Sequence, residues 1–211
     1  MFAEVLGWVA AIIGSSFSIP QIHRILTART TAGLSLLMWQ FMVTSGICWT
    51  THGFLIGKPN VIAPNMFSLL CSLVVLVMIR RHRSMGFLTV WALPLAVAAV
   101  MIAVDFGWGP LVFGLGMAIP QVIGMGAQAV DIMRSLDLSG VSPVSMTLSL
   151  LIQGLWCVWG ISVGEMAVIA SSFLTGMSAL VTLGWYLMRR LRIVGPIPVS
   201  YTHLTLPTTP Y

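Results

Sequence analysis

The chain has 211 residues, of which 58% are hydrophobic and only 7% are charged, and its formal net charge is +5. A soluble domain carries roughly 25% charged residues, so this composition excludes an ordinary water-soluble fold. Apolar runs of about the ~20-residue length that crosses a bilayer recur along the chain, with turn residues between them. We therefore expect an all-α integral membrane protein, located in the cell membrane.

Seven membrane-spanning helices are predicted from hydropathy and turn residues. In chain order they cover residues 5–22, 34–56, 61–79, 87–104, 109–130, 144–163 and 166–188. With the fourth of these, which contains Pro94, nine of the ten Lys and Arg residues fall on one side, whereas without it the division is five against five. The positive-inside rule therefore favours seven crossings, with the N-terminus outside and the C-terminus cytoplasmic.

An internal repeat divides the chain into two similar units. A shift of 100 residues places Gly7–Trp8 on Gly107–Trp108 and Pro20–Gln21 on Pro120–Gln121. Farther along, a shift of 107 residues aligns Gly33 with Gly140, Ser35 with Ser142, Trp49 with Trp156, Gly53 with Gly160, Gly57 with Gly164, and 61–63 with 168–170. We expect two three-helix bundles in the same orientation, 1–84 and 106–192, joined by a linker helix over 85–105.

A Pro-Gln pair in the first helix of each unit, with an unpaired helix between the units, resembles the PQ-loop superfamily. Within it, the arrangement is most similar to the SWEET and SemiSWEET sugar transporters. The likeness rests on Trp49 and Asn65, sixteen positions apart, and the second copy keeps this spacing in Trp156 and Ser172. The resemblance implies that these four residues line a central pocket where the two bundles meet.

The chemistry of these side chains suits a neutral sugar. The Asn65 amide both donates and accepts hydrogen bonds, as sugar hydroxyls do, and Ser172 can do so more weakly. The flat indoles of Trp49 and Trp156 offer stacking area for the apolar face of a pyranose. With about 1 kcal/mol for each hydrogen bond and no ion pair, millimolar affinity is expected. The alternatives are an interfacial belt for the tryptophans and hydrogen bonds between helices for Asn65 and Ser172.

The Pro20–Gln21 and Pro120–Gln121 pairs are predicted hinges for alternating access. Each proline removes a backbone N–H and bends its helix, and the following glutamine could bond the freed carbonyl. A static kink is the alternative. By resemblance, Pro143 at the start of the sixth helix is a further hinge proline, whereas Leu36 occupies the matching place in the first unit.

The predicted spans contain no carboxylate, which is the usual sign of a proton relay. We expect Glu4, Asp105, Glu165, Asp131 and Asp137 to be solvated, at span ends or in a cytoplasmic loop. His52 is the one ionisable residue predicted within a span, and we expect it to be hydrogen-bonded or exposed to water. These features favour a facilitator that moves a mono- or disaccharide down its gradient.

Two other functions belong to the same superfamily. A proton-coupled amino-acid exporter resembling the cystinosin branch would be expected to carry an acid near the second Pro-Gln, where this chain has 122–124, Val-Ile-Gly. A non-transporting receptor of the KDEL-receptor type would be expected to carry basic residues in its pocket, and the predicted spans contain none. Both are therefore less favoured than sugar transport.

No Ser/His/Asp set, metal cluster or phosphate loop is present, so we expect no enzyme activity, no cofactor and no metal. The arginines cluster at the ends of apolar runs, which favours membrane topology over nucleic-acid binding. The expected partners are the lipid bilayer and the sugar, and the sequence leaves open whether chains form a homo-oligomer. Residues 193–211 are predicted to be a disordered tail, either native or an artefact of sequence assembly, and carry no functional assignment.

Overall fold

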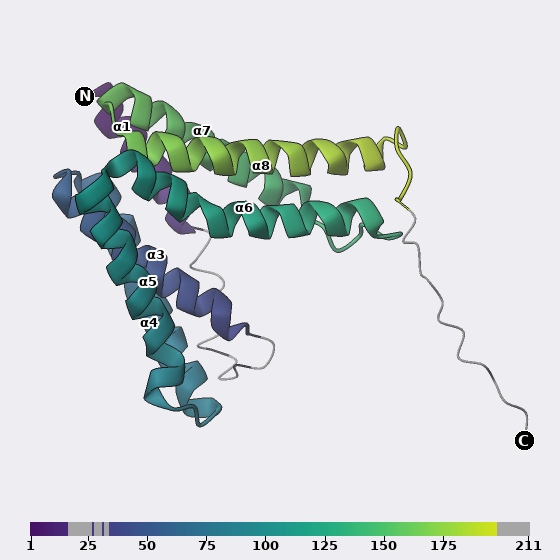
Figure 1. Cartoon of the computed structure of the whole chain (residues 1–211). Helices are drawn as coiled ribbons and strands as arrows, with labels where there is room; N and C mark the ends of the chain where they lie inside the picture. Colours follow the sequence, from purple (N-terminus) through teal and green to yellow (C-terminus); the bar gives the residue numbers. More distant parts are fainter. Residues whose placement is uncertain (17–26, 28–30, 32–33, 198–211) are drawn as a thin grey trace, which may run out of the picture.

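The computed structural model describes residues 1–16, 27, 31 and 34–197. Within these residues the chain forms helices and no strands, which confirms the all-α prediction (Figure 1). The helices are α1 (Phe2–Ser16), α3 (Leu36–Leu55), α4 (Pro59–His82), α5 (Phe87–Trp108), α6 (Pro110–Arg134), α7 (Pro143–Val163) and α8 (Met166–Arg190).

Helices α4 to α8 are each long and apolar enough to cross a membrane, and α1 is a shorter apolar helix. α5 corresponds to the predicted fourth span. Large apolar side chains such as Leu70, Val100 and Ile123 are exposed on the outside of these helices. Because a helix satisfies its own backbone groups, an apolar outer surface of this kind suits contact with lipid. The chain is therefore a helical integral membrane protein.

The two copies fold into the same helical hairpin, α3 with α4 and α7 with α8. Gly57 ends the first turn with a φ of 63° and Gly164 ends the second with a φ of 73°. The amide after each glycine donates to the carbonyl five residues earlier, at 3.0 Å in the first hairpin and 2.8 Å in the second. Glycine suits both positions because left-handed backbone costs it little. The 107-residue shift is thus reproduced in three dimensions.

A close helix contact next to each turn repeats as well. A Cβ atom added at Gly53 would lie 2.9 Å from Ile62 Cγ1, and one added at Gly160 would lie 2.9 Å from Ile169 Cγ1. These two glycines therefore allow the hairpin helices to approach closely, and their partners are also separated by 107 residues.

The second helix of each unit begins with the same cap. Ser35 accepts from the amide three residues later at 3.3 Å, and Ser142 does the same at 3.3 Å. Leu36 and Pro143 then occupy the first helical position, where a proline loses no helical hydrogen bond. Pro143 consequently lies at the start of α7 and not within it.

The linker helix α5 is held to α3 by a buried glutamine. Pro94 lies inside α5 and cannot donate to the Val90 carbonyl. Gln40 of α3 supplies the missing donor at 2.9 Å and also donates to the Thr89 carbonyl at 3.1 Å. The Val90 carbonyl, which Pro94 leaves without a helical donor, is therefore hydrogen-bonded by a residue of the first unit.

The linker helix extends farther than the sequence boundary at residue 105. α5 continues through Trp108, Gly109 ends it with a φ of 86°, and α6 begins at Pro110. Gly107 and Trp108 accordingly lie in the last turn of α5, whereas Gly7–Trp8, their partners under the 100-residue shift, lie within α1.

Packing of the first helix on the third follows the 107-residue shift instead. Gly7 of α1 lies against Asn60 of α4, and Gly114 of α6 lies against Ala167 of α8. In both pairs the absence of a side chain allows the close approach. The position of α1 on α4 thus corresponds to the position of α6 on α8 at this contact.

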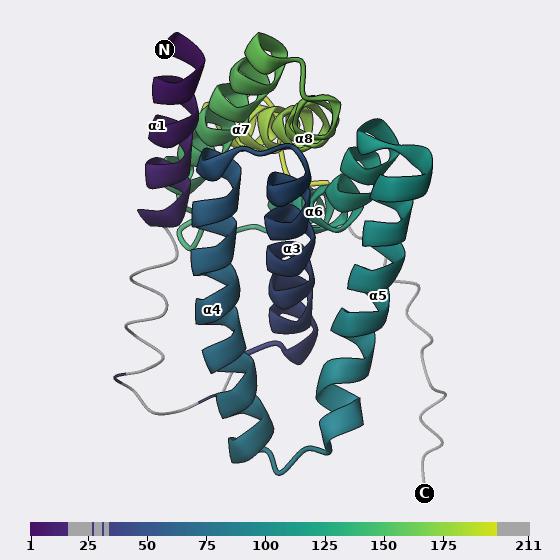
Figure 2. The ribbon, with the colours of Figure 1, turned by 90° about the vertical axis from the view of Figure 1, so that its left-hand side faces the viewer.

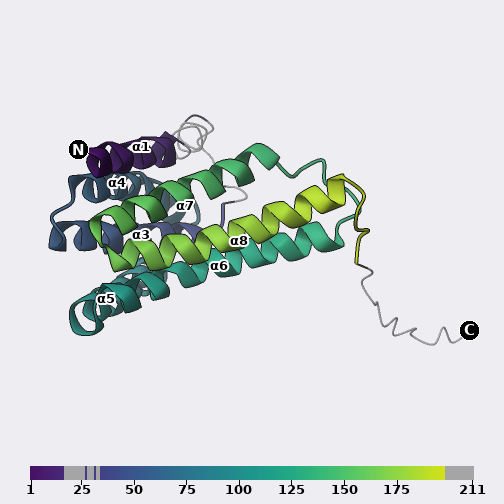
Figure 3. The same ribbon diagram turned by 90° about the horizontal axis from the view of Figure 1, so that it is seen from above.

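The helices form two arms that meet at one end (Figures 1 and 2). In one arm α8 packs against α6 and α7, and in the other α3 packs against α4 and α5. α1 packs against both α4 and α7, so it joins the arms (Figure 3). We call the meeting point, which contains residues 56–58, 108–110 and 163–166, the closed end, and the diverging opposite ends the open end.

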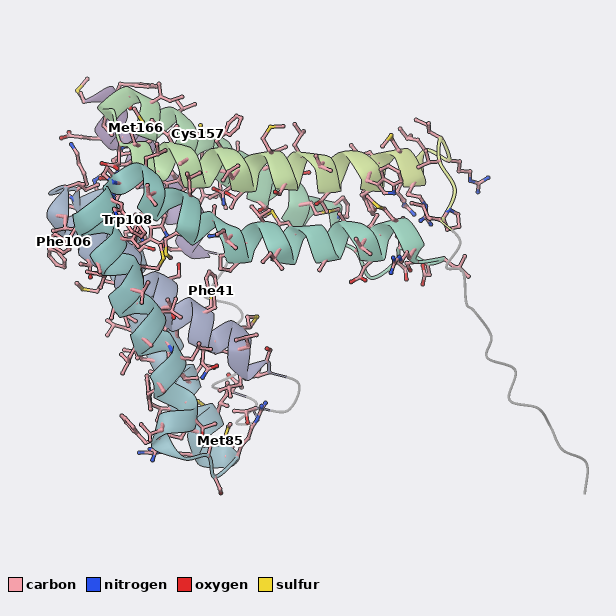
Figure 4. The ribbon with its side chains drawn as sticks, in the orientation of Figure 1. Phe41, Met85, Phe106, Trp108, Cys157 and Met166 are labelled. Carbon is pink, nitrogen blue, oxygen red and sulfur yellow. The ribbon has the colours of Figure 1, made fainter. Side chains whose placement is uncertain are left out.

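Side chains mark these two ends in Figure 4, where Phe106 and Met166 lie at the closed end and Met85 lies at the far end of one arm. Lys58 begins α4 at the closed end. The described arginines lie at or after the open ends of the helices: Arg80, Arg81, Arg83, Arg134, Arg189, Arg190 and Arg192. The open end is therefore the strongly basic one.

Candidate functional site

A cavity of about 240 Å³ lies between the two three-helix units. It is lined by α1, α3 and α4 of the first unit and by α6, α7 and α8 of the second. Such a space holds a small solute and not only a single water molecule. The structure places all four predicted binding residues around it: Trp49, Asn65, Trp156 and Ser172.

The two third helices contribute matching faces to this cavity. Residues at helical positions i, i+3, i+4 and i+7 share one face of a helix. On this face α4 contributes Val61, Pro64, Asn65 and Ser68, and α8 contributes Val168, Ser171, Ser172 and Thr175; Phe67 of α4 also lines the cavity, without a counterpart from α8. Each α8 residue follows its α4 counterpart by 107 positions, so the cavity is built from repeated pairs.

Asn65 and Ser172 make the same hydrogen bond but differ in what remains free. Asn65 Nδ2 donates to the Val61 carbonyl at 2.8 Å, and the Ser172 hydroxyl donates to the Val168 carbonyl. The Asn65 amide keeps an N–H and its oxygen, whereas Ser172 keeps only an acceptor oxygen. Ser172 is also 3% exposed, whereas Asn65 is half-buried. Asn65 is therefore better placed to bind a polar ligand.

Both predicted tryptophans are half-buried in the cavity wall and have an aromatic neighbour three residues later. The rings of Trp49 and His52 lie 5.7 Å apart at 88°, and those of Trp156 and Trp159 lie 5.5 Å apart at 86°. Edge contacts of this kind are favourable for aromatic rings. The placement favours the pocket interpretation of these indoles over an interfacial belt.

Several polar residues that line the cavity were not predicted from the sequence. Ser68 and Thr175 lie one turn after Asn65 and Ser172, and this helical spacing could have found them. Gln153 lies one turn before Trp156, but nothing in its sequence context distinguishes it from a lipid-facing residue. Among the described residues that line the cavity, none carries an ionisable side chain. The lining thus suits a neutral polar ligand.

The predicted hinges are only partly described. Pro120 lies inside α6, whereas Pro20–Gln21 lies outside the described residues. Gln121 lines the cavity, and in this conformation no hydrogen bond joins its side chain to another described residue, the carbonyl freed by Pro120 included. Its amide remains available to a ligand.

An ionic cluster lies next to this cavity at the closed end. We call His52, Asp105 and Glu165 the closed-end cluster. His52 Nδ1 lies 2.7 Å from Asp105 Oδ2, and His52 Nε2 lies 3.3 Å from Glu165 Oε1. The side chains are only 1%, 5% and 13% exposed in that order, so the expectation of solvated acids is wrong for two of them. The ends of α5 and α8 converge on α3 here, which residue order along the chain does not reveal.

Glu165 also caps α8, accepting from the Ala167 amide at 3.0 Å. Burial alone would raise the pKa of Glu165. The hydrogen bonds from His52 and from this amide outweigh burial and hold the pKa below its ordinary value. The carboxylate form is therefore favoured when His52 is a donor.

Comparison with known proteins finds a match to part of the chain. The family model for the PQ loop repeat matches residues 2–62, which include α1, α3 and the start of α4. A search of the curated proteins finds no match to the chain. The matched segment covers the first two helices of the first copy and the start of its third helix. Residues 2–62 are therefore similar to a PQ loop repeat, within a chain that folds as a helical membrane protein.

Proposed function

We propose that the protein is a transporter that facilitates the diffusion of a neutral small sugar by alternating access. The observation that carries this proposal is the cavity between the units. It combines two indoles with amides and hydroxyls, and its described lining includes no ionisable side chain.

The free hydrogen-bonding groups suit a polyol. Asn65, Gln121 and Gln153 present amides that both donate and accept, as each sugar hydroxyl does. Trp49 and Trp156 add apolar faces from the two sides of the repeat. A few neutral hydrogen bonds worth about 1 kcal/mol each imply millimolar binding, which allows fast release.

The arrangement of the arms supports alternating access. Parallel repeats of this kind rock about a site at their interface. Here the units meet at the closed end and diverge at the basic open end, which the positive-inside rule predicts to be cytoplasmic (Figure 1). This conformation would therefore face the cytoplasm.

The rival ligands would need charged partners. An amino acid carries an ammonium and a carboxylate, and a peptide retrieved by its C-terminus carries a carboxylate, so either would leave a charge unpaired in this cavity. The described lining favours the sugar over both.

The test is counterflow in proteoliposomes with a panel of labelled mono- and disaccharides. We expect saturable exchange of at least one sugar, with millimolar half-saturation, and weaker exchange in Asn65→Ala. Ser178→Ala is the matched control, because its hydroxyl bonds only the Leu174 carbonyl of its own helix and does not line the cavity. Absence of exchange for every sugar, or unchanged exchange in Asn65→Ala, would contradict the proposal.

A further inference from the structure

The closed-end cluster contains more acid than base. One imidazole contacts two carboxylates, Asp105 from α5 and Glu165 from the start of α8. A neutral imidazole has a single N–H, so it can donate to only one of them. Because both ring nitrogens of His52 face a carboxylate oxygen, the geometry requires one further proton, on the imidazole or on a carboxyl group.

The surroundings do not supply another close charge to replace that proton. From α3 the neighbouring titratable group is the Cys48 thiol, and from α6 the ring of Phe113 stacks on His52 at 5.0 Å. Lys58, which begins α4, attracts Glu165 but makes no ion pair with it among the described residues. Without the extra proton, the cluster would hold two buried carboxylates against a neutral ring, which is costly.

The cluster also bridges the parts that must separate. His52 belongs to the first unit, Asp105 to the linker helix and Glu165 to the second unit. If the closed end opens, these groups part or become hydrated, and the need for the shared proton disappears. Proton binding and closure are then linked, and each promotes the other.

A direct contact connects the cluster to the cavity. Trp49 lines the cavity, and its ring lies 5.7 Å from the ring of His52 and 5.2 Å from that of Phe113. Separation of His52 from the second unit would therefore disturb one of the two indoles that we assign to the sugar.

We propose that His52, Asp105 and Glu165 form a proton-binding site that holds the closed end shut, so that proton binding stabilises this conformation and proton release accompanies its opening. The inference rests on the alternating access of the proposed function. Acidification on the side of the closed end favours closure, and alkalinisation favours opening. For one linked proton, the ratio of closed to open molecules changes by up to about tenfold per pH unit.

The experiment measures the distance between spin labels at the closed end, in lipid nanodiscs, from about pH 5 to about pH 8. Labels replace Phe54 and Ile161, which are exposed and occupy matching positions of the two units. The native cysteines Cys48, Cys71 and Cys157 are replaced by alanine. We expect a short distance to dominate at acidic pH and a longer one to gain population as the pH rises.

The decisive variant neutralises the cluster with His52→Gln, Asp105→Asn and Glu165→Gln together. It keeps the side-chain sizes, and the amide oxygen introduced by Glu165→Gln can still cap α8. We expect its distance distribution to be independent of pH. The matched control is His82→Gln, which removes an exposed histidine at the open end and should leave the pH response unchanged. If the triple variant does not fold, Asp105→Asn alone should weaken the response.

A pH-independent distance in the unmutated cluster overturns the inference, as does a response of undiminished size in the triple variant or in folded Asp105→Asn. The readout uses no substrate, so it separates the two proposals. If the pH response is present but no sugar is exchanged, the assignment of the sugar fails and the proton site stands. If sugar is exchanged but the distance ignores pH, the proton site fails alone.

Discussion

The hairpin of α3 and α4 and the hairpin of α7 and α8 share their turn, their glycine contact and their helix cap, but they differ in chemistry at the closed end. His52 of the first corresponds to Trp159 of the second, and Lys58 corresponds to Glu165. Backbone geometry is thus conserved between the copies because it depends on small residues at a few positions. The side chains on that backbone are free to diverge. At the same position, His52 makes a titratable contact in the first hairpin and Trp159 makes an aromatic one in the second.

The same comparison holds inside the cavity. Trp49 and Trp156 are identical between the copies, whereas Asn65 is matched by the smaller and more buried Ser172. The units therefore share a stacking surface but contribute unequally to hydrogen bonding. Four predictions test how far this likeness and this inequality extend.

The largest effect is expected where the first helix meets the third. A Cβ at Gly114 would clash with the Ala167 carbonyl oxygen, a backbone atom, whereas a Cβ at Gly7 would clash with the side chains of Asn60 and Trp159. Backbone atoms yield less easily, so Gly114→Ala should lower the free energy of unfolding by about 3 kcal/mol, and Gly7→Ala by less. Thermal unfolding in detergent measures both.

Gly14→Ala is the control for this pair, because its nearest neighbour, Ile152 Cγ2, lies at an ordinary 3.9 Å. A melting temperature of Gly114→Ala equal to that of Gly14→Ala would show that α6 and α8 are not packed as closely as the repeat requires.

The second effect concerns the unequal cavity. Asn65→Ala removes two free hydrogen-bonding groups, worth about 2 kcal/mol or roughly 30-fold in half-saturation concentration. Ser172→Ala removes one acceptor and should cost only about fivefold. Counterflow at a series of sugar concentrations gives both values, and equal losses would mean that the two halves of the cavity bind alike.

The third effect concerns the linker helix, whose backbone accepts hydrogen bonds from Gln40 of the first unit. Gln40→Leu leaves the Val90 carbonyl without its donor at 2.9 Å and should lower the free energy of unfolding by about 2 kcal/mol. Thr147 is the matching position of α7 and is exposed, so Thr147→Val should change stability little. Equal melting temperatures for the two variants would argue against this attachment of α5.

The smallest effect is expected to be the same in both units. Ser35→Ala and Ser142→Ala each remove a helix cap of 3.3 Å, so each should cost about 0.5–1 kcal/mol. Thermal unfolding of the two variants should give equal shifts, with Ser178→Ala as a reference for loss of a hydroxyl within a helix. A clear inequality would show that the hairpins are less alike in energy than in geometry.

Repeat alignment predicts much of the fold and part of the site. The 107-residue shift matches the turns at Gly57 and Gly164, and it places Trp49 opposite Trp156 at the cavity. Such positions are readable because tryptophan is rare in the chain and because several glycines recur with the same spacing. Gln153 was missed because a single polar residue in a long helix has no such signal.

The closed-end cluster could not be predicted for a different reason. Asp105 and Glu165 lie at helix ends, and an isolated helix end is usually solvated. Their burial depends on the convergence of α3, α5 and α8, which is a property of the packed molecule. The 100-residue shift likewise paired Gly107 with Gly7, although Gly107 belongs to the end of α5.

Lys58 and Glu165 occupy matching positions of the two units but carry opposite charges, and this has a consequence for how such a protein can be assembled. In a dimer of two identical units, every side chain occurs twice around a two-fold axis, so both copies of this position would carry the same charge. Here α5 joins two units of different sequence in one chain, so the N-cap of α4 is a cation and the N-cap of α8 is an anion. A single histidine, His52, can then contact two different acids, an asymmetric arrangement that a symmetric dimer of one unit could not form.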